Sequence, residues 1–151
     1  MIRIVVVGKK HETMYLDAIN HFEKRLKPWQ KIEWLIIPPS GKNHELARTE
    51  ESTMITAKLG SDDFVVLLDE EGEPLSSPEI AKELEKAQNQ SKNIVFVIGG
   101  AYGVDEHIKS RANLNISFGR AVFPHQLVRV MLLEQLYRAH SILAGSGYHH
   151  V

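Results

Sequence analysis

Short apolar runs, rich in β-branched residues, alternate along the chain with longer stretches in which apolar and polar residues mix. The runs have the length of strands buried in a sheet, and they occupy residues 2–7, 32–37, 64–68, 94–98 and 114–118. Strands that alternate with helices predict an α/β fold, with a mostly parallel sheet and helices on both of its faces. Since the pattern contains no repeat and no linker, it predicts a single domain over residues 1–151.

The mixed stretches have helical spacing. Tyr15, Ile19, Phe22 and Leu26 follow one another at intervals of four, three and four residues, which predicts one face of a helix over 14–26. A second start signal is the run Ser77-Pro78-Glu79, which predicts a helix with Ser77 as its N-cap. The remaining helices are predicted over residues 44–59, 105–112 and 124–143.

The last predicted helix carries apolar residues almost all round. They are Leu127, Val128, Val130, Met131, Leu132, Leu133, Leu136, Tyr137, Ile142 and Leu143. A helix that is apolar on every side must be buried on every side, and a terminal helix of so small a domain cannot achieve this within its own chain. We therefore expect a homodimer, with Leu133 on the face that meets the partner.

Composition fits one globular domain. The chain has 151 residues, of which 43% are hydrophobic and 25% charged. No apolar run approaches the ~20 residues of a membrane span, and the first strand is too short to be a signal peptide. Because the chain has no cysteine, disulfides, thiolate catalysis and zinc–cysteine sites are excluded. These features predict a cytoplasmic protein that does not bind a membrane.

The formal net charge of −1 conceals an uneven distribution. Residues 1–31 carry seven lysines and arginines against three acidic residues, whereas residues 60–90 carry nine acidic residues against two lysines. The last part of the chain adds five of the eight histidines. A nucleic-acid binder needs a basic footprint, which here would have to be built from the two ends of the chain. Ordinary solvated surface charge explains the same distribution equally well.

The run from Val95 to Gly103, a strand that leads into glycines, is the first candidate binding feature. Glycines at the carboxyl end of a parallel strand let a ligand approach the backbone, at the edge where open α/β sheets bind ligands. The spacing matches neither the dinucleotide-binding pattern G-x-G-x-x-G nor a P-loop. A tight turn from strand to helix would explain the glycines as well, so both interpretations stay open.

The second candidate is the segment 117–130, in which a short strand leads through a loop with apolar and aromatic walls into the last helix. His125 and Arg129 lie one turn apart and share a face, and Glu134 and Arg138 repeat that spacing. Charged groups on so apolar a helix need partners, because unpaired buried charge is costly. For Glu134 and Arg138 an ion pair and a functional role are equally compatible with the pattern, whereas for Arg129 we favour a functional role.

The carboxyl-terminal tail holds two glycines followed by Tyr148, His149 and His150. Chain ends are usually disordered, but this composition also suits a flexible arm that closes over a site. The paired histidines do not form a metal signature, and no H-E-x-x-H spacing occurs, so we expect no metal site. Four further histidines lack partners in the sequence and are expected at the surface, namely His11, His21, His44 and His107.

Several of these segments together resemble the RlmH family, the pseudouridine N3-methyltransferases of ribosomal RNA in the SPOUT superfamily. The resemblance rests on the run from Phe123 to Val130, its continuation from Glu134 to Ala139, Ile98-Gly99-Gly100 upstream and Tyr148-His149 near the end. It extends over the whole chain, because Val7-Gly8-Lys9, the segment 22–26 and the turn from Leu68 to Gly72 also match.

The resemblance implies a SPOUT-like homodimer in which the carboxyl-terminal part of the chain forms a trefoil knot. It also implies that S-adenosyl-L-methionine, the methyl donor, binds in the knot, held largely by backbone groups. Carried over to this sequence, the donor pocket consists of Leu68, Gly99, Gly100, Phe118, Gly119, Arg120, Ala121, Val122 and Phe123.

The activity implied by the resemblance is methylation of N3 of a pseudouridine in large-subunit (23S) ribosomal RNA. Because N3 of a uracil-type base must lose its proton to attack well, the site needs a base or a cation that stabilises the developing anion. The candidate catalytic residues are Arg129, which would stabilise this charge or position the base, and His125, which would contact the substrate or support a residue that does. Tyr148 and His149 would form a lid. The family tail usually ends Tyr-His-Arg, whereas this chain has His150 in the third position.

The nearly neutral charge indicates that naked RNA is a poor substrate and that an assembled ribosomal particle supplies the missing contacts. Two alternatives remain at the level of sequence. One is a SPOUT methyltransferase of another RNA, such as transfer RNA. The other is a non-catalytic nucleotide-binding factor in ribosome assembly.

Overall fold

The structure is a computed structural model, and it describes residues 1–90 and 92–150. Five strands form one sheet in the order β2-β1-β4-β3-β5, and every pair of neighbouring strands is parallel. The strands are β1 (Ile2–Val7), β2 (Ile32–Ile37), β3 (Phe64–Glu73), β4 (Ile94–Ile98) and β5 (Leu114–Ile116). The predicted α/β fold with a parallel sheet is confirmed.

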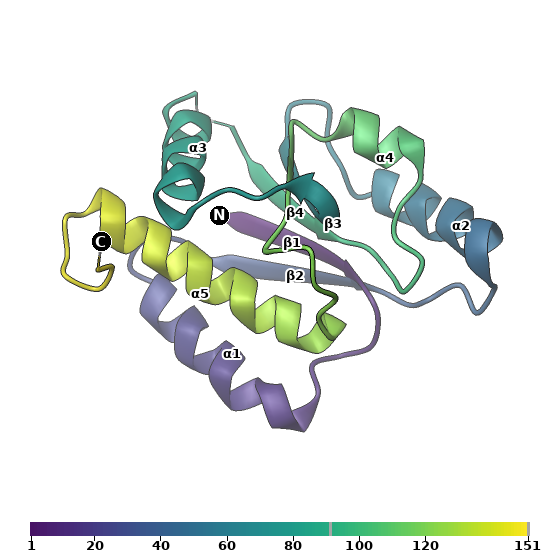
Figure 1. Cartoon of the computed structure of the whole chain (residues 1–151), viewed down its shortest axis with the longest axis horizontal. Coiled ribbons are helices and arrows are strands. Elements are labelled where there is room, and N and C mark those ends of the chain that lie inside the picture. The colour runs from purple at the N-terminus through teal and green to yellow at the C-terminus, as the bar shows by residue number, and fades with distance from the viewer. Residues whose placement is uncertain (91, 151) are drawn as a thin grey trace.

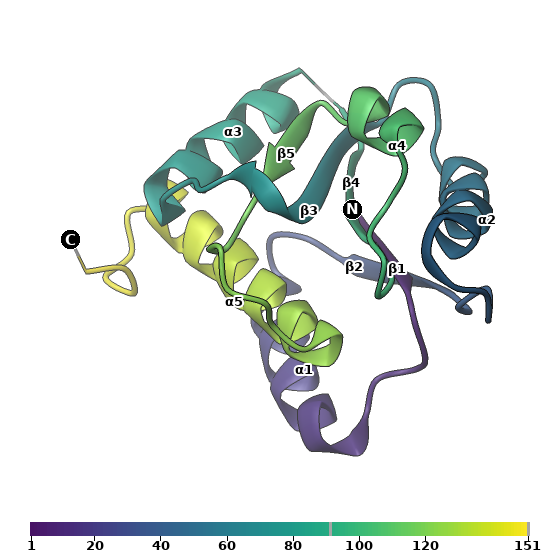
Figure 2. The same ribbon diagram turned by 45° about the vertical axis from the view of Figure 1, so that its right-hand side comes forward.

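Helices cover both faces of the sheet, as predicted. Three of them pack on one face, namely α1 (Thr13–Leu26), α3 (Ser77–Asn89) and α5 (His125–Leu143). The other face is covered by α2 (His44–Thr56) and α4 (Glu106–Arg111). Figures 1 and 2 show the two groups of helices on opposite sides of the sheet.

Successive side chains of a strand point to opposite faces of the sheet, so a separate hydrophobic core lies on each face. In β1, Ile2, Ile4 and Val6 point toward α1, α3 and α5, whereas Val5 and Val7 point toward α2 and α4. The strand is apolar at both sets of positions because both faces of the sheet are covered.

The third strand continues beyond its predicted end at residue 68. Leu68 and Glu73 both pair with Ile116, so the segment between them bulges out of the ladder. A Cβ atom at Gly72 would lie 2.7 Å from the carbonyl carbon of Ile116, which explains the glycine in the expected turn from Leu68 to Gly72. This bulge carries the acidic residues of β3 to the edge of the sheet where the strands end.

The amino terminus of α3 is capped by Ser76 and not by Ser77, which corrects the prediction. The Ser76 hydroxyl accepts a hydrogen bond from the Glu79 backbone N–H, and the Glu79 carboxylate accepts one from the Ser76 N–H, which makes a capping box. Ser77 instead donates a hydrogen bond to the side chain of Gln135 on α5 at 2.6 Å.

The last helix is covered from two sides within its own chain, because α1 and α3 flank it (Figure 1). Leu133, expected on a face that meets a partner, is instead completely buried in the core. Val130 and Met131 are half-buried and line a groove between α3, α5 and the loop after β5. Within the described residues, no helix combines the length and apolarity that a membrane span requires.

Candidate active site

A cavity of about 320 Å³ lies at the carboxyl ends of β3 and β4, next to the loop that joins β5 to α5. This is the edge at which open α/β sheets bind ligands. Of the residues predicted for the donor pocket, the lining includes Leu68, Gly99, Gly100, Phe118, Gly119, Ala121, Val122 and Phe123. Arg120 is exposed and lies outside that lining, so its place in a donor site stays a prediction.

The cavity has apolar walls with a few polar groups at its edges. Phe118, Phe123 and Val128 contribute apolar surface, while Asp69 and Glu70 add carboxylates from the bulge of β3. This combination suits a ligand with an aromatic ring and polar ends.

The two glycines at the end of β4 are required by their protein neighbours. A Cβ atom at Gly99 would lie 2.9 Å from Cγ1 of Val104, and one at Gly100 would lie 2.5 Å from Oε1 of Glu51. Packing therefore accounts for the identity of these two glycines, and the Gly103 N–H closes a turn here by donating to the Gly100 carbonyl at 3.0 Å. Because both also line the cavity, they leave backbone close to whatever occupies it.

Glu51, on α2, is a buried carboxylate that no pattern in the sequence indicated. Only 4% of its surface is exposed, and its Oε2 accepts a hydrogen bond from the Ser40 backbone N–H at 3.0 Å. Its Oε1 has no hydrogen-bond partner among the described residues. This carboxylate connects the loop after β2 with the glycine turn after β4.

His125 and Arg129 lie beside the cavity, as their spacing on one helix face predicted. His125 is half-buried and lines the cavity. Burial, and then the positive charge of Arg129, lower the pKa of His125, although a hydrogen bond with the Val7 backbone and the Glu51 carboxylate oppose this shift. The imidazole is therefore mostly neutral near pH 7.

Arg129 is the largest fully buried side chain, with 1% of its surface exposed. Its Nη1 lies 3.1 Å from Nδ1 of His11, and its Nε has no partner among the described residues. A Cβ atom at Gly8 would lie 2.8 Å from Nη2, so the glycine after β1 makes room for the guanidinium. A buried cation with an unused donor, one helical turn from His125, can stabilise negative charge that develops nearby.

His11 was predicted at the surface, which is wrong. It is half-buried between Arg129 and the ring of Trp34, whose centroid lies 4.5 Å away. The loop that carries it is fixed to α5 by Gln126, which accepts from the Glu12 N–H at 3.0 Å and donates to the Lys10 carbonyl at 3.2 Å. The only signal in the sequence was the position of His11 after the first strand, at the same sheet edge as the glycines.

The tail residues Tyr148 and His149 pack against the far half of α5. The Tyr148 hydroxyl donates to Glu134 at 3.2 Å, and Nδ1 of His149 lies 3.0 Å from Nη1 of Arg138. Arg138 and Glu134 form an ion pair at 2.6 Å, one of the two interpretations that their spacing had left open.

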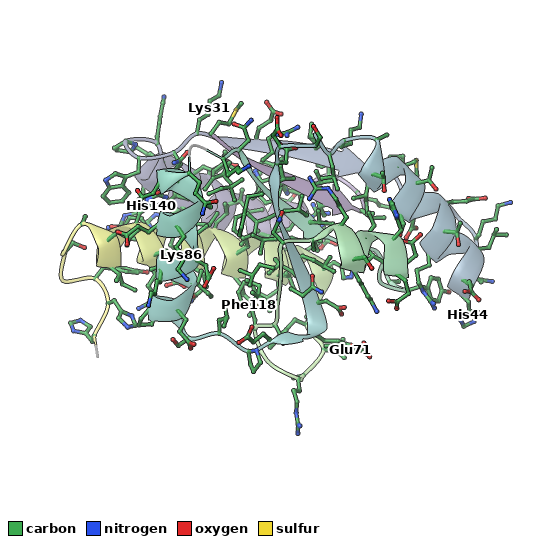
Figure 3. All side chains as sticks on the ribbon, turned by 90° about the horizontal axis from the view of Figure 1, so that it is seen from above. Lys31, His44, Glu71, Lys86, Phe118 and His140 are labelled. Carbon is green, nitrogen blue, oxygen red and sulfur yellow. The ribbon has the colours of Figure 1, made fainter. Side chains whose placement is uncertain are left out.

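This end of α5 is distant from the cavity. From His125 to Arg138 the helix advances about 20 Å. Figure 3 shows His140 in the half of the molecule that carries the tail, with Phe118, which lines the cavity, nearer the middle. Within one chain, the structure brings Arg129 and His125 together but leaves Tyr148 and His149 apart from them.

No metal site is evident within the described residues, where no three histidine or acidic side chains are grouped to hold an ion.

Comparison with known proteins places the chain in a family. A family model described as "Predicted SPOUT methyltransferase" matches residues 1–149. Ribosomal RNA large subunit methyltransferase H of Caldicellulosiruptor bescii is 39% identical over 153 residues and is covered, like this chain, to 99%. The protein of the same name from Caldicellulosiruptor saccharolyticus gives the same identity and coverage.

Among solved structures, the tRNA (m1G37) methyltransferase of Aquifex aeolicus shares the fold, with a TM-score of 0.50 and 20% identity, over 91% of this chain and 69% of that chain. The cavity at the sheet edge, the shared fold and the family-model match over residues 1–149 support the same assignment. The chain belongs to the SPOUT methyltransferase family.

Proposed function

We propose that this protein transfers the methyl group of S-adenosyl-L-methionine to N3 of a pseudouridine in large-subunit ribosomal RNA, on assembled ribosomal particles in the cytoplasm. The observation that carries the proposal is the cavity with glycine backbone and apolar walls, beside which Arg129 and His125 stand together. The full-length relatives named ribosomal RNA large subunit methyltransferase H support the choice of RNA.

The chain's own residues fit such a donor. Phe118, Phe123 and Val128 offer apolar surface to an adenine ring, and the backbone at Gly99 and Gly100 offers close polar contacts. The donor supplies a methyl group bound to a positively charged sulfur. A nucleophile aligned with the carbon–sulfur bond takes the methyl group, and the sulfur leaves by in-line displacement.

The acceptor nitrogen must lose a proton, and two side chains meet that need. The guanidinium of Arg129 remains charged at all relevant pH values and stabilises the anion that develops on the base. The imidazole of His125, whose pKa is lowered by burial and by Arg129, is neutral near pH 7 and can accept a hydrogen bond or a proton.

The proposed active species is a homodimer whose chains each carry a carboxyl-terminal trefoil knot. The position of Tyr148 and His149, which contact Glu134 and Arg138 at about 14 to 20 Å along α5 from His125, argues for the dimer. A tail that lies so far from its own cavity can act as a lid only over the cavity of a second copy. The half-buried residues Val130 and Met131 in the groove beside α3 offer apolar surface for that copy.

The test is incubation with labelled S-adenosylmethionine and separate samples of ribosomal subunits, 70S particles, naked ribosomal RNA and transfer RNA, followed by mapping of the methylated nucleotide. We expect one pseudouridine of the large-subunit RNA to be labelled, and only within assembled particles. Labelling of transfer RNA would replace the proposed substrate, and donor binding without transfer to any of these would support a non-catalytic assembly factor.

A further inference from the structure

A basic surface with an exposed aromatic ring lies where α1 ends. Within the segment 24–31, Lys24, Arg25, Lys27, Trp29 and Lys31 are all exposed, and no acidic residue interrupts them. We call these five residues the basic platform. The nearest acidic residue before them in the chain, Glu23, accepts a hydrogen bond from the Trp34 indole.

Trp29 packs against two aromatic rings of α5. Its indole stacks on the ring of His140 at 5.8 Å and 12°, and it also lies 5.8 Å from the ring of Tyr137. With 42% of its surface exposed, the indole is supported from the protein side and open toward solvent. The fixed, exposed ring offers a face on which a nucleic-acid base can stack.

Cations alternate with aromatic rings across this surface. The guanidinium of Arg25 lies 4.9 Å from the centre of the Tyr137 ring, and that of Arg138 lies 4.8 Å from the centre of the Tyr148 ring. Tyr137 and Tyr148 in turn meet edge to face at 4.7 Å. The fold thus joins basic residues near the start of the chain to aromatic residues near its end, which forms the local footprint that a nearly neutral RNA-binding protein needs.

We propose that the basic platform binds a single-stranded or looped segment of the RNA substrate away from the target nucleotide. The lysines and Arg25 contact phosphates, and Trp29 stacks on one base. The inference rests on the proposed function, because it takes RNA as the substrate. It adds a second contact region on the side of α5 next to α1, outside the cavity.

The experiment compares the wild-type 151-residue chain with three variants. The first variant is Lys24→Gln/Lys27→Gln/Lys31→Gln, and the second is Trp29→Leu, which keeps an apolar side chain against His140. The matched control is Lys82→Gln/Lys86→Gln/Lys92→Gln, which removes the same charge from exposed positions on and after α3. Binding of large-subunit ribosomal RNA is measured at several salt concentrations, together with donor binding, sedimentation and the kinetics of methyl transfer.

We expect the platform triple variant to bind RNA on the order of tenfold to a hundredfold more weakly, and its salt dependence to fall by about two in the slope of log K against log salt. Trp29→Leu should weaken binding on the order of tenfold with an unchanged slope. KM for RNA should rise in both variants while kcat and donor binding stay near wild type, and the control should behave as wild type.

RNA affinity equal to that of wild type, or equal losses in the control, would overturn the platform. So would a variant that sediments as a smaller species, because the surface would then belong to a second copy of the chain. If wild-type protein binds ribosomal RNA through the platform but methylates none, the platform stands and the proposed activity fails. If the wild-type protein methylates RNA and the variants have the same KM for RNA, the activity stands and the platform fails.

Discussion

Nδ1 of His11 lies 3.1 Å from Nη1 of Arg129, although the two residues are 118 positions apart. A guanidinium can only donate hydrogen bonds, so Nδ1 of His11 must be the acceptor and cannot carry a proton. Burial, and then the charge of Arg129, lower the pKa of His11, which agrees with a neutral ring. The buried cation is therefore supported by an imidazole that must remain uncharged.

This relationship predicts how stability depends on pH. Burial lowers the pKa values of His11, His125 and His140 in the folded protein, with Arg129 adding to the first two. In the unfolded chain these groups titrate near 6.5, so below that pH the unfolded state binds more protons than the folded state. Their contribution to stability should be complete above pH 7 and decline as the pH falls below about 6.5.

Urea unfolding at pH 8, 7, 6 and 5.5 measures this decline, and His11→Asn should flatten part of it. Free energy of unfolding that rises between pH 7 and 5.5 would contradict the assignment of buried neutral histidines.

Replacement of Arg129 by lysine should cut methyl transfer by about a hundredfold or more. A lysine keeps the charge but loses the planar fork that faces His11 and Gly8. Donor affinity should change little, because Arg129 is not among the residues that line the cavity. Single-turnover rates and titration calorimetry separate the two effects. A fully active Arg129→Lys protein would remove Arg129 from the catalytic residues.

Bulk introduced at Ala121 should block donor binding, whereas the same change at Asn89 should not. Ala121 lines the cavity, while Asn89 is exposed at the end of α3 and lies outside the lining. We expect Ala121→Trp to weaken S-adenosylmethionine binding by about tenfold or more, and Asn89→Trp to leave it near wild type. This pair is a better test than a substitution at Gly99, where a side chain would first collide with Val104. Calorimetric titration measures the affinity of both variants for S-adenosylmethionine. Equal affinities would contradict the assigned pocket.

Removal of the tail from Tyr148 onward should leave donor binding intact and reduce methyl transfer by orders of magnitude, since Tyr148 can stack on a base and His149 can hydrogen-bond to base or phosphate. His150→Arg, which introduces a permanent cation, should be neutral or increase activity at pH 8, where imidazole is mostly uncharged. Methyl-transfer rates on ribosomal particles, compared for wild type, the truncation and His150→Arg, test both expectations. An active truncation would mean that the tail has no role as a lid.

An acidic residue at Met131 should separate the proposed dimer, because Met131 is half-buried and lines the groove beside α3. Met131→Asp should sediment as a folded monomer with weakened or absent methyl transfer. Leu133→Asp should instead unfold the chain, at a cost of about 4 kcal/mol or more, because it places a charge in the core. Circular dichroism distinguishes the two variants. A wild-type protein that sediments as a monomer at micromolar concentration would argue against the dimer.

The sequence predicted the strands well because buried parallel strands are apolar at nearly every position, as in Ile94–Ile98. It missed the continuation of β3, because the bulge residues from Asp69 to Gly72 are acidic or small and have no alternating pattern. The misplaced cap of α3 has a simple cause, since Ser76 and Ser77 are adjacent and only the geometry with Glu79 selects between them.

The site was predicted in part. His125 and Arg129 share a helix face, which spacing alone reveals, and glycines after a strand mark a sheet edge. His11 and Glu51 could not be found in this way, because each reaches the site from an element that the sequence does not connect to α5. Leu133 was assigned to a partner because the pattern shows that the helix is buried all round but not which chain covers each side.

The Glu51 carboxylate fills the space that a side chain at position 100 would need. Any side chain at position 100 would enter the volume of the Glu51 carboxylate, and a shorter residue at position 51 would leave the Ser40 N–H without its acceptor. In the evolutionary history of such chains, the two positions should therefore have changed together or not at all. A natural sequence with alanine at position 100 should carry a smaller residue at position 51 and a different route for the loop after β2.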